Sequence, residues 1–278
     1  EAPSQHDFDH VYTHQLYAGF GHKQFGELTY GNMVTITDEV KQSDLANTYS
    51  LTDGLLETSA RRVTQYVYNG DYGSNKVKFG AYYGGSSKRN IKNVDLKNNR
   101  KNTWGTGLIF NHEIDSIQNV TVAAGFTRQI SENANKTAYY SNAYALGLAY
   151  NFVHTTYGLD LAHKDTKNKG GAGNKVKNNE VTAVIRQGLN EDWNVYAMYS
   201  YKTEKTLPVG SAYSKSTDRQ FLVGTEYYVF KQGSVKVKPF IEWQATRTKY
   251  ENTFDKDSGK QLDRSRDFKT VIGLRAYW

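Results

Sequence analysis

The sequence contains no cysteine and only three prolines among its 278 residues. Without cysteine there are no disulfides, thiolate zinc sites, iron–sulfur clusters or cysteine nucleophiles. Long apolar runs are also missing, since no stretch approaches the roughly 20 apolar residues that a membrane-spanning helix needs. A helical membrane protein, a disulfide-stapled domain and a thiol enzyme are therefore excluded.

Aromatic residues and glycine are abundant. Aromatics make up 14% of the chain, with 22 tyrosines, and there are 24 glycines. This composition is too aromatic for a disordered chain, and tyrosine and phenylalanine favour strands. The net charge is +7. We expect no nucleic-acid partner, because the basic residues are scattered over several segments and match no nucleic-acid-binding motif.

Alternation of apolar with small or polar residues recurs along the chain from residue 11 to 278. Between Ala143 and His154, for example, Tyr144, Leu146 and Leu148 alternate with Ala145, Gly147 and Ala149. A period of two is typical of strands that present one face to each side of a sheet. We count about thirteen such segments, which predicts an all-β fold.

The connections alternate between short and long. Long connections are predicted at 32–60, 84–102, 131–142, 164–178, 204–218 and 247–266. Transmembrane antiparallel β-barrels have this rhythm, with short turns on one side of the membrane and long loops on the other. A large soluble β-sandwich is the alternative, although its loops are not expected to sort so strictly.

Since each connection reverses the chain, we can count strand directions back from the last strand. The first strand then runs in the same direction as the last, so the number of strands is odd. Bacterial single-chain barrels have even strand numbers, because closure leaves no unpaired edge. Residues 1–278 are therefore expected to form a single barrel domain whose first strands precede Glu1. An intact mass of 31.5 kDa for the native protein would contradict this hypothesis.

Two segments carry a family resemblance. LYAGFGHKQFGELTYGNMVTITDEVKQSD at residues 16–44 resembles the strand–turn–strand that leads into a long loop in porins, and VIGLRAYW at 271–278 resembles their terminal strand. The likeness is to the trimeric general diffusion porins of Gram-negative outer membranes, above all the major porins of the Pasteurellaceae. The resemblance implies a barrel of sixteen strands and a homotrimer in the outer membrane.

In that family the loop after the Tyr-Gly strand folds into the barrel and narrows the pore. Here it would span residues 32–60, which are rich in acids and contain one lysine. The candidate constriction acids are Asp38, Glu39, Asp44, Asp53 and Glu57. Facing a basic wall, they would create a transverse field that sorts ions. Alternatively, the acids only keep the loop solvated.

For the basic side we expect Arg61 and Arg62, which follow the loop. Only one can face the lumen, and we favour Arg62. Charges within strands should face water, because a basic residue on the lipid face costs about 2–4 kcal/mol at mid-membrane. Alternation predicts the following lumen-facing residues: Lys78, Arg186, Glu226, Glu242 and Arg275.

The long loops outside the barrel are basic. Two of them hold lysine and arginine clusters: Lys88, Arg89, Lys92, Lys97, Arg100 and Lys101, and then Lys164, Lys167, Lys169, Lys175 and Lys177. These side chains are either simply solvated or contact the phosphates of lipopolysaccharide and other outer-membrane lipids.

These features predict a passive, water-filled general diffusion porin for ions and small hydrophilic solutes, with no enzyme activity, cofactor or metal. The alternatives are a substrate-specific channel and a barrel that acts as an adhesin or receptor. A sugar channel should line its lumen with aromatics, and Tyr66, Tyr82, Tyr196 and Tyr228 do not clearly form such a row.

Overall fold

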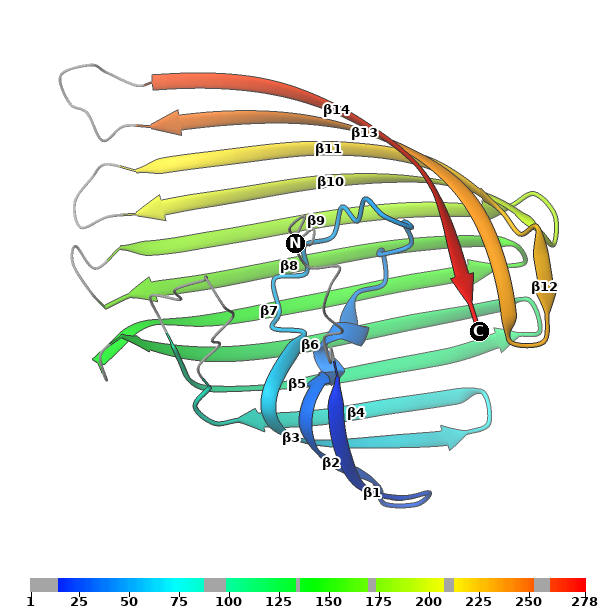
Figure 1. The fold of residues 1–278 in the computed structure, drawn as a ribbon, viewed down its shortest axis with the longest axis horizontal. Coiled ribbons are helices and arrows are strands. Elements are labelled where there is room, and N and C mark those ends of the chain that lie inside the picture. Colours follow the sequence, from blue (N-terminus) through cyan, green and yellow to red (C-terminus); the bar gives the residue numbers. More distant parts are fainter. Residues whose placement is uncertain (1–14, 88–98, 134–135, 170–173, 208–212, 253–260) are drawn as a thin grey trace, which may run out of the picture.

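A computed structural model describes residues 15–87, 99–133, 136–169, 174–207, 213–252 and 261–278. These residues form one antiparallel sheet of 14 strands and one short 3-10 helix, η2 (Ile36–Val40) (Figure 1). The strands are β1 (Leu16–His22), β2 (Gly26–Val34), β3 (Ser59–Tyr72), β4 (Asn75–Gly84), β5 (Asn99–Asp115), β6 (Gln118–Asn133), β7 (Lys136–Phe152), β8 (Thr155–Asn168), β9 (Lys175–Gly188), β10 (Trp193–Leu207), β11 (Ser214–Tyr227), β12 (Phe230–Gln232), β13 (Val235–Asn252) and β14 (Gln261–Tyr277). The predicted all-β antiparallel fold is confirmed.

Strand order follows chain order except at β12. From β1 to β11, each strand pairs with the next along the chain. β11 then pairs with β13, which also pairs with β14, and the three-residue β12 pairs with the beginning of β13. The sheet curves strongly, with β1 at one edge and β14 at the other (Figure 1). Among the described residues, β1 pairs only with β2 and β14 only with β13.

The two faces of the sheet differ as the alternation predicts. On β7, Tyr144 and Leu146 are exposed on the outer, convex face, whereas Ala143 and Gly147 on the other face are buried. On β10, Tyr199 is exposed and Met198 and Ser200 are buried. No helix among the described residues is long and apolar enough to cross a membrane.

The strands are longer than the alternation predicts, and the prediction of a long loop at 131–142 is wrong. β6 runs to Asn133 and β7 begins at Lys136. The strands that flank the other expected long loops are extended in the same way. Where both faces of a wall meet water, the side chains no longer need to alternate, while backbone hydrogen bonds continue the ladder. Hydropathy therefore marks only the half-buried part of each strand.

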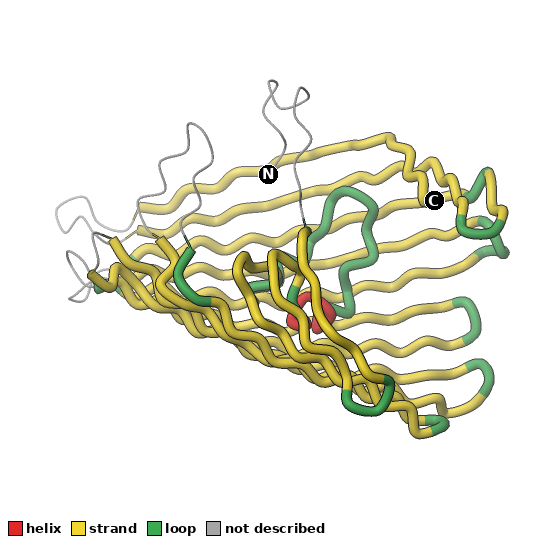
Figure 2. The backbone as a smooth tube through the Cα atoms, turned by 60° about the horizontal axis from the view of Figure 1, so that its bottom comes forward, coloured by secondary structure: helices red, strands yellow, loops and turns green. Residues whose placement is uncertain are grey.

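Residues 35–58, between β2 and β3, lie on the concave side of the sheet (Figure 2). We call this segment the inner loop. Its ends are joined by a hydrogen bond from Thr35 N to Thr58 O at 2.8 Å. The inner loop crosses a track of glycines on five neighbouring strands: Gly80, Gly107, Gly125, Gly147 and Gly158. A Cβ on Gly158 would lie 2.6 Å from the carbonyl oxygen of Gln42, so this close approach requires glycine.

Candidate functional site: the inner loop and its wall

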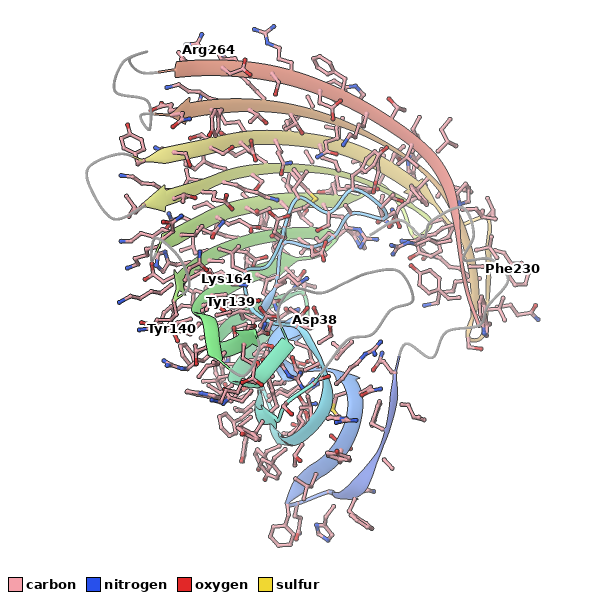
Figure 3. The ribbon with its side chains drawn as sticks, turned by 60° about the vertical axis from the view of Figure 1, so that its left-hand side comes forward. Asp38, Tyr139, Tyr140, Lys164, Phe230 and Arg264 are labelled. Carbon is pink, nitrogen blue, oxygen red and sulfur yellow. The ribbon has the colours of Figure 1, made fainter. Side chains whose placement is uncertain are left out.

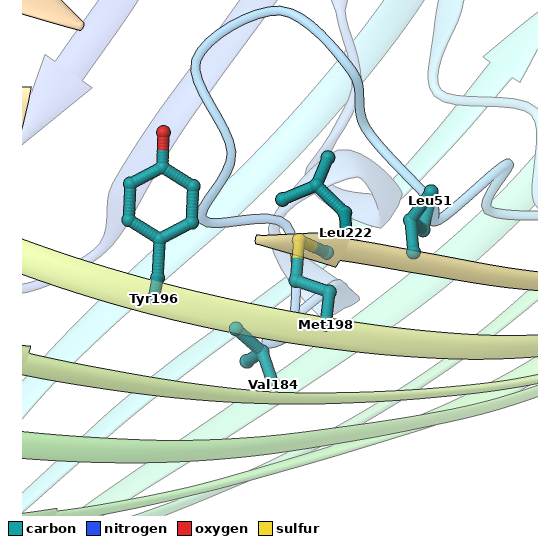
Figure 4. Close-up of a cluster of buried hydrophobic side chains, with 5 residues drawn as sticks. All are labelled: Leu51, Val184, Tyr196, Met198 and Leu222. Carbon is teal, nitrogen blue, oxygen red and sulfur yellow. The ribbon is translucent and has the colours of Figure 1, made fainter. Parts of the chain in front are cut away.

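Apolar side chains of the inner loop are buried against the wall. Ile36 and Val40 of η2 are buried over the glycine track. At the far end of the loop, Leu51 is fully buried among Val184, Tyr196, Met198 and Leu222 of β9, β10 and β11 (Figure 4). Burying a leucine contributes about 1.5–3 kcal/mol, so these contacts help to hold the loop inside.

Four carboxylates of the wall accept hydrogen bonds from the inner loop, and each is at most 5% exposed. We call Asp160, Glu180, Glu226 and Glu242 the anchor carboxylates. Asp160 on β8 accepts from Gln42 N at 2.8 Å, from Ser43 N at 2.8 Å and from Ser43 Oγ at 2.5 Å. Glu180 on β9 accepts from Asp53 N at 2.9 Å. Hydrogen bonds to charged groups are stronger than neutral ones, which suits a loop that must keep its position.

Asn47 bonds the inner loop to four strands of the wall. Its backbone N donates to Glu242 at 2.5 Å, and its carbonyl oxygen accepts from Arg275 on β14. Its side-chain nitrogen donates to Glu226 at 2.8 Å and to the Tyr196 hydroxyl at 2.9 Å. Four neighbouring strands, β10, β11, β13 and β14, thus meet at one loop residue that is far from them in the sequence.

Glu226 and Glu242 belong to one charged network with the wall cations. Glu226 on β11 pairs with Lys238 at 2.6 Å and with Arg186 on β9. Glu242 on β13 also accepts from Thr48 N and Tyr49 N, at 3.0 and 2.9 Å. Four of the five residues expected to face the lumen, Arg186, Glu226, Glu242 and Arg275, therefore lie together beside the inner loop.

The acids of the inner loop are much more exposed than the anchor carboxylates, with 30% to 61% of their side-chain surface accessible. Three of them pair with lysines of the wall: Glu39 with Lys78 at 2.5 Å, Glu57 with Lys164 at 3.1 Å and Asp53 with Lys202 at 2.7 Å. Asp38 and Asp44 lie 3.5 and 3.7 Å from Lys41 of the loop itself (Asp38 and Lys164 are labelled in Figure 3).

A cavity of about 220 Å³ adjoins the Glu39–Lys78 pair. It lies between η2 and the concave face of β1 to β4, and polar groups of Glu27, Gln65 and Asn69 line it. Gln65 also accepts a hydrogen bond from Ile36 N at 2.7 Å, which fixes the start of η2. The Glu39–Lys78 pair thus borders open space on the concave side.

Arg61 and Arg62 lie where the inner loop joins β3, and both are exposed. Neither forms an ion pair with a carboxylate in the described part of the chain. Arg62 has a positive φ of 54°, opposite an irregularity between Gly31 and Met33 of β2. The alternation is broken there, which is why it could not decide which arginine faces inward. Their role at a constriction stays a prediction.

Sequence reasoning missed Lys164, Lys202 and Asn47. Lys164 and Arg100 were expected in basic external loops, yet Lys164 pairs with Glu57 and the Arg100 guanidinium donates to the carbonyl oxygens of Arg61 and Gly85. The alternation could have identified both lysines as inward-facing. Lys164 lies on the same face of β8 as the buried Asp160, and Lys202 lies on the same face of β10 as the buried Met198.

A curved antiparallel wall with a charged loop folded against its concave face is the architecture of a β-barrel channel. The chain belongs to the Gram-negative porin family, whose sequence pattern matches residues 3–239. It is therefore a porin of the bacterial outer membrane.

Relatives of known name are distant. The chain is 23% identical to a major outer membrane protein of Pasteurella multocida over 274 residues, covering 96% of this chain and 68% of that protein. It is 22% identical over 249 residues to the major outer membrane protein of strain Pm70, covering 84% of this chain and 64% of that one. The chain thus spans about two thirds of their length.

Solved structures share the fold. OmpT, an outer membrane protein of Vibrio cholerae, superposes with a TM-score of 0.67 at 16% identity, covering 96% of this chain and 80% of OmpT. An anion-selective porin from Comamonas acidovorans superposes with a TM-score of 0.54 at 14% identity, covering 91% and 74%. At such identities the likeness speaks for the fold alone.

Proposed function

We propose that this porin is a general diffusion channel whose narrowest part lies between the inner loop and the wall. The observation that carries the proposal is the set of ion pairs between exposed loop acids and wall lysines, Glu39–Lys78, Asp53–Lys202 and Glu57–Lys164. The five loop acids form the acidic side. Lys78, Lys164 and Lys202 form the basic side, with Arg61 and Arg62 as further candidates.

Opposite charges on two sides of a narrow, water-filled opening produce a field across it. Such a field orients dipolar solutes and sorts ions, while passage needs no covalent chemistry. The loop and wall carboxylates differ in what they offer a passing ion. The loop acids present oxygen atoms to water, whereas the anchor carboxylates are occupied by the loop backbone.

A sugar-specific channel is the less favoured alternative. The aromatic side chains that could have lined its lumen do not lie in one row. Tyr82 and Tyr196 are buried beneath the inner loop, at 4% exposure each, and Tyr66 lies on the outer face, where its hydroxyl donates to Phe25 O. An adhesin or receptor built on this barrel should conduct little current.

We further propose a homotrimer surrounded by lipopolysaccharide and other outer-membrane lipids. A trimer form has been solved for Vibrio cholerae OmpT, which superposes on this chain with a TM-score of 0.60 at 14% identity. The lipid partner is supported by basic strand ends. Lys167, Lys175 and Lys177, for instance, occupy the ends of β8 and β9 next to the long loops.

Single-channel recording of the native protein in a planar bilayer under a salt gradient tests the proposal. Large ohmic steps that close in threes under voltage are expected for a trimeric diffusion pore. Saturation of the current by one sugar, with little block by others, would favour the substrate-specific channel instead. Silence from correctly folded protein would overturn the channel proposal.

A further inference from the structure

Three arginines lie side by side on neighbouring strands. Arg219 of β11 is directly opposite Arg247 of β13, and Arg247 is directly opposite Arg266 of β14. All three are exposed. Since the pairing of these strands shows no register shift, the three side chains project from the same face of the sheet.

The row of three arginines destabilises the isolated protein. Neighbouring strands are about 4.8 Å apart, and like charges directly opposite one another are destabilising. In the described part of the chain, none of the three arginines forms an ion pair with a carboxylate. Arg219 lies over the ring of Tyr201, 5.9 Å from its centre, which leaves its charge uncompensated.

Further cations occupy the same face toward the strand ends. Lys249 is directly opposite Arg264, and Lys205 is directly opposite both Lys177 and Lys215 (Arg264 is labelled near the start of β14 in Figure 3). We call these eight residues the basic belt: Lys177, Lys205, Lys215, Arg219, Arg247, Lys249, Arg264 and Arg266. Only Asp165 and Glu251 interrupt these rows with acids, and Glu251 pairs with Lys249 at 2.5 Å.

An aromatic surface lies directly beside the basic belt. Phe221 and Phe268 follow Arg219 and Arg266 by two residues on the same face, about 7 Å away along each strand. Trp243 lies 6.5 Å from Phe221 and 6.1 Å from Phe268, ring centre to ring centre. All three rings are exposed on the outer face. In membrane barrels, exposed aromatic residues near the strand ends mark the boundary between the lipid tails and the headgroups.

We propose that the basic belt binds the phosphate groups of a phosphorylated lipid in the outer leaflet, with the acyl chains against Phe221, Trp243 and Phe268. Arginine suits this task because its planar guanidinium donates two parallel hydrogen bonds to a phosphate. A bound phosphate would also remove the repulsion within the Arg219–Arg247–Arg266 row. The inference deepens the proposed lipid partnership by moving its centre from the basic loops to the outer face of β9 to β14.

Native mass spectrometry of the detergent-solubilised protein with bisphosphorylated lipid A as the probe tests the belt. The triple variant R219Q/R247Q/R266Q should bind lipid A about tenfold or more weakly, because each charge-assisted hydrogen bond contributes on this order. Dephosphorylated lipid A should bind the native protein equally weakly. The control variant K23Q/K231Q/K236Q removes the same charge at the short-turn end and should bind as the native protein does.

The arginine-to-lysine triple variant R219K/R247K/R266K keeps the charge and guards against a variant that fails to fold. Its affinity should lie between those of the native protein and the glutamine variant. Equal binding by the native protein and both triple variants overturns the proposal, as does equal binding of the two forms of lipid A. A changed oligomeric state of the glutamine variant with unchanged lipid binding also overturns it, since the belt would then contact a second copy of this chain. Because pore conductance is measured separately, a silent channel with intact lipid binding overturns only the proposed function.

Discussion

The wall and the inner loop use the same chemical group in opposite ways. The carboxylates of Asp160 and Glu242 are buried and accept backbone N–H groups of the loop, whereas those of Asp53 and Glu39 are exposed and meet lysines. The comparison teaches that a carboxylate on the inner face of a β-wall is not by itself a selectivity group. If a loop covers it, the carboxylate fixes the loop instead.

The largest effect is expected from replacing an anchor carboxylate of the wall. Glu242→Gln leaves one acceptor oxygen where three backbone N–H groups and the Tyr196 hydroxyl now donate. Unsatisfied buried donors cost about 1–3 kcal/mol, so we expect the free energy of unfolding to fall by about 2–3 kcal/mol and the open-channel current to become noisier. Thermal unfolding and single-channel recording measure these changes. Glu27→Gln, at an exposed wall acid on β2, is the control and should change neither.

Gly158→Ala should displace the loop without touching a charge. Its new Cβ would lie 2.6 Å from Gln42 O, beside the bonds between Asp160 and the loop. We expect loss of about 1–3 kcal/mol of stability, as for other overpacked sites, together with a changed conductance. Gly85→Ala is the matched control, because nothing lies within 4 Å of its new Cβ. Equal effects of the two substitutions would argue against a tightly seated loop.

Reversing the exposed loop acids should alter selectivity rather than stability. A unit charge a few ångströms from a passing ion contributes about 1 kcal/mol in water, so Asp53→Lys should shift the anion-to-cation permeability ratio about fivefold toward anions. The reversal potential under a salt gradient reports this shift. Glu191→Lys, in the turn between β9 and β10, makes the same charge change away from the loop and serves as the control. An unchanged reversal potential for Asp53→Lys would remove this residue from the constriction.

The smallest effects are expected from single basic residues. Lys202→Gln should shift permeability toward cations by about twofold. The side chain of Lys202 is only 13% exposed, so its charge should act on a passing ion by less than the roughly 1 kcal/mol of a unit charge a few ångströms away in water. Arg61→Gln and Arg62→Gln should shift permeability less, because neither arginine meets a loop acid among the described residues. A larger effect at Arg61 or Arg62 than at Lys202 would place the basic side of the constriction where the inner loop joins β3.

Much of the wall follows from alternation alone, because each strand has one apolar and one polar face. The parity of Arg186, Glu226, Glu242 and Arg275 was predicted from their neighbours, and these side chains lie together in the structure. Strand ends in water could not be predicted, since the backbone ladder continues where hydropathy no longer alternates. This is how Lys164 came to be assigned to a loop.

The path of the inner loop was not predictable from its own residues. Asn47 carries four bonds to distant strands, yet nothing in the local sequence distinguishes it. Its partners lie about 150 to 230 residues away in the chain. The glycine track was visible as small residues on one face, but a water-filled lumen would show the same pattern.

The most direct test of the division between loop and wall uses the absence of cysteine. Single cysteines at Asp53 and at Ser43, which is fully buried, are exposed to charged, membrane-impermeant thiol reagents during single-channel recording. We predict that D53C reacts rapidly, with positive and negative reagents shifting selectivity in opposite directions, while S43C does not react. Equal reactivity at both positions, or modification of D53C without any change in current, would contradict it.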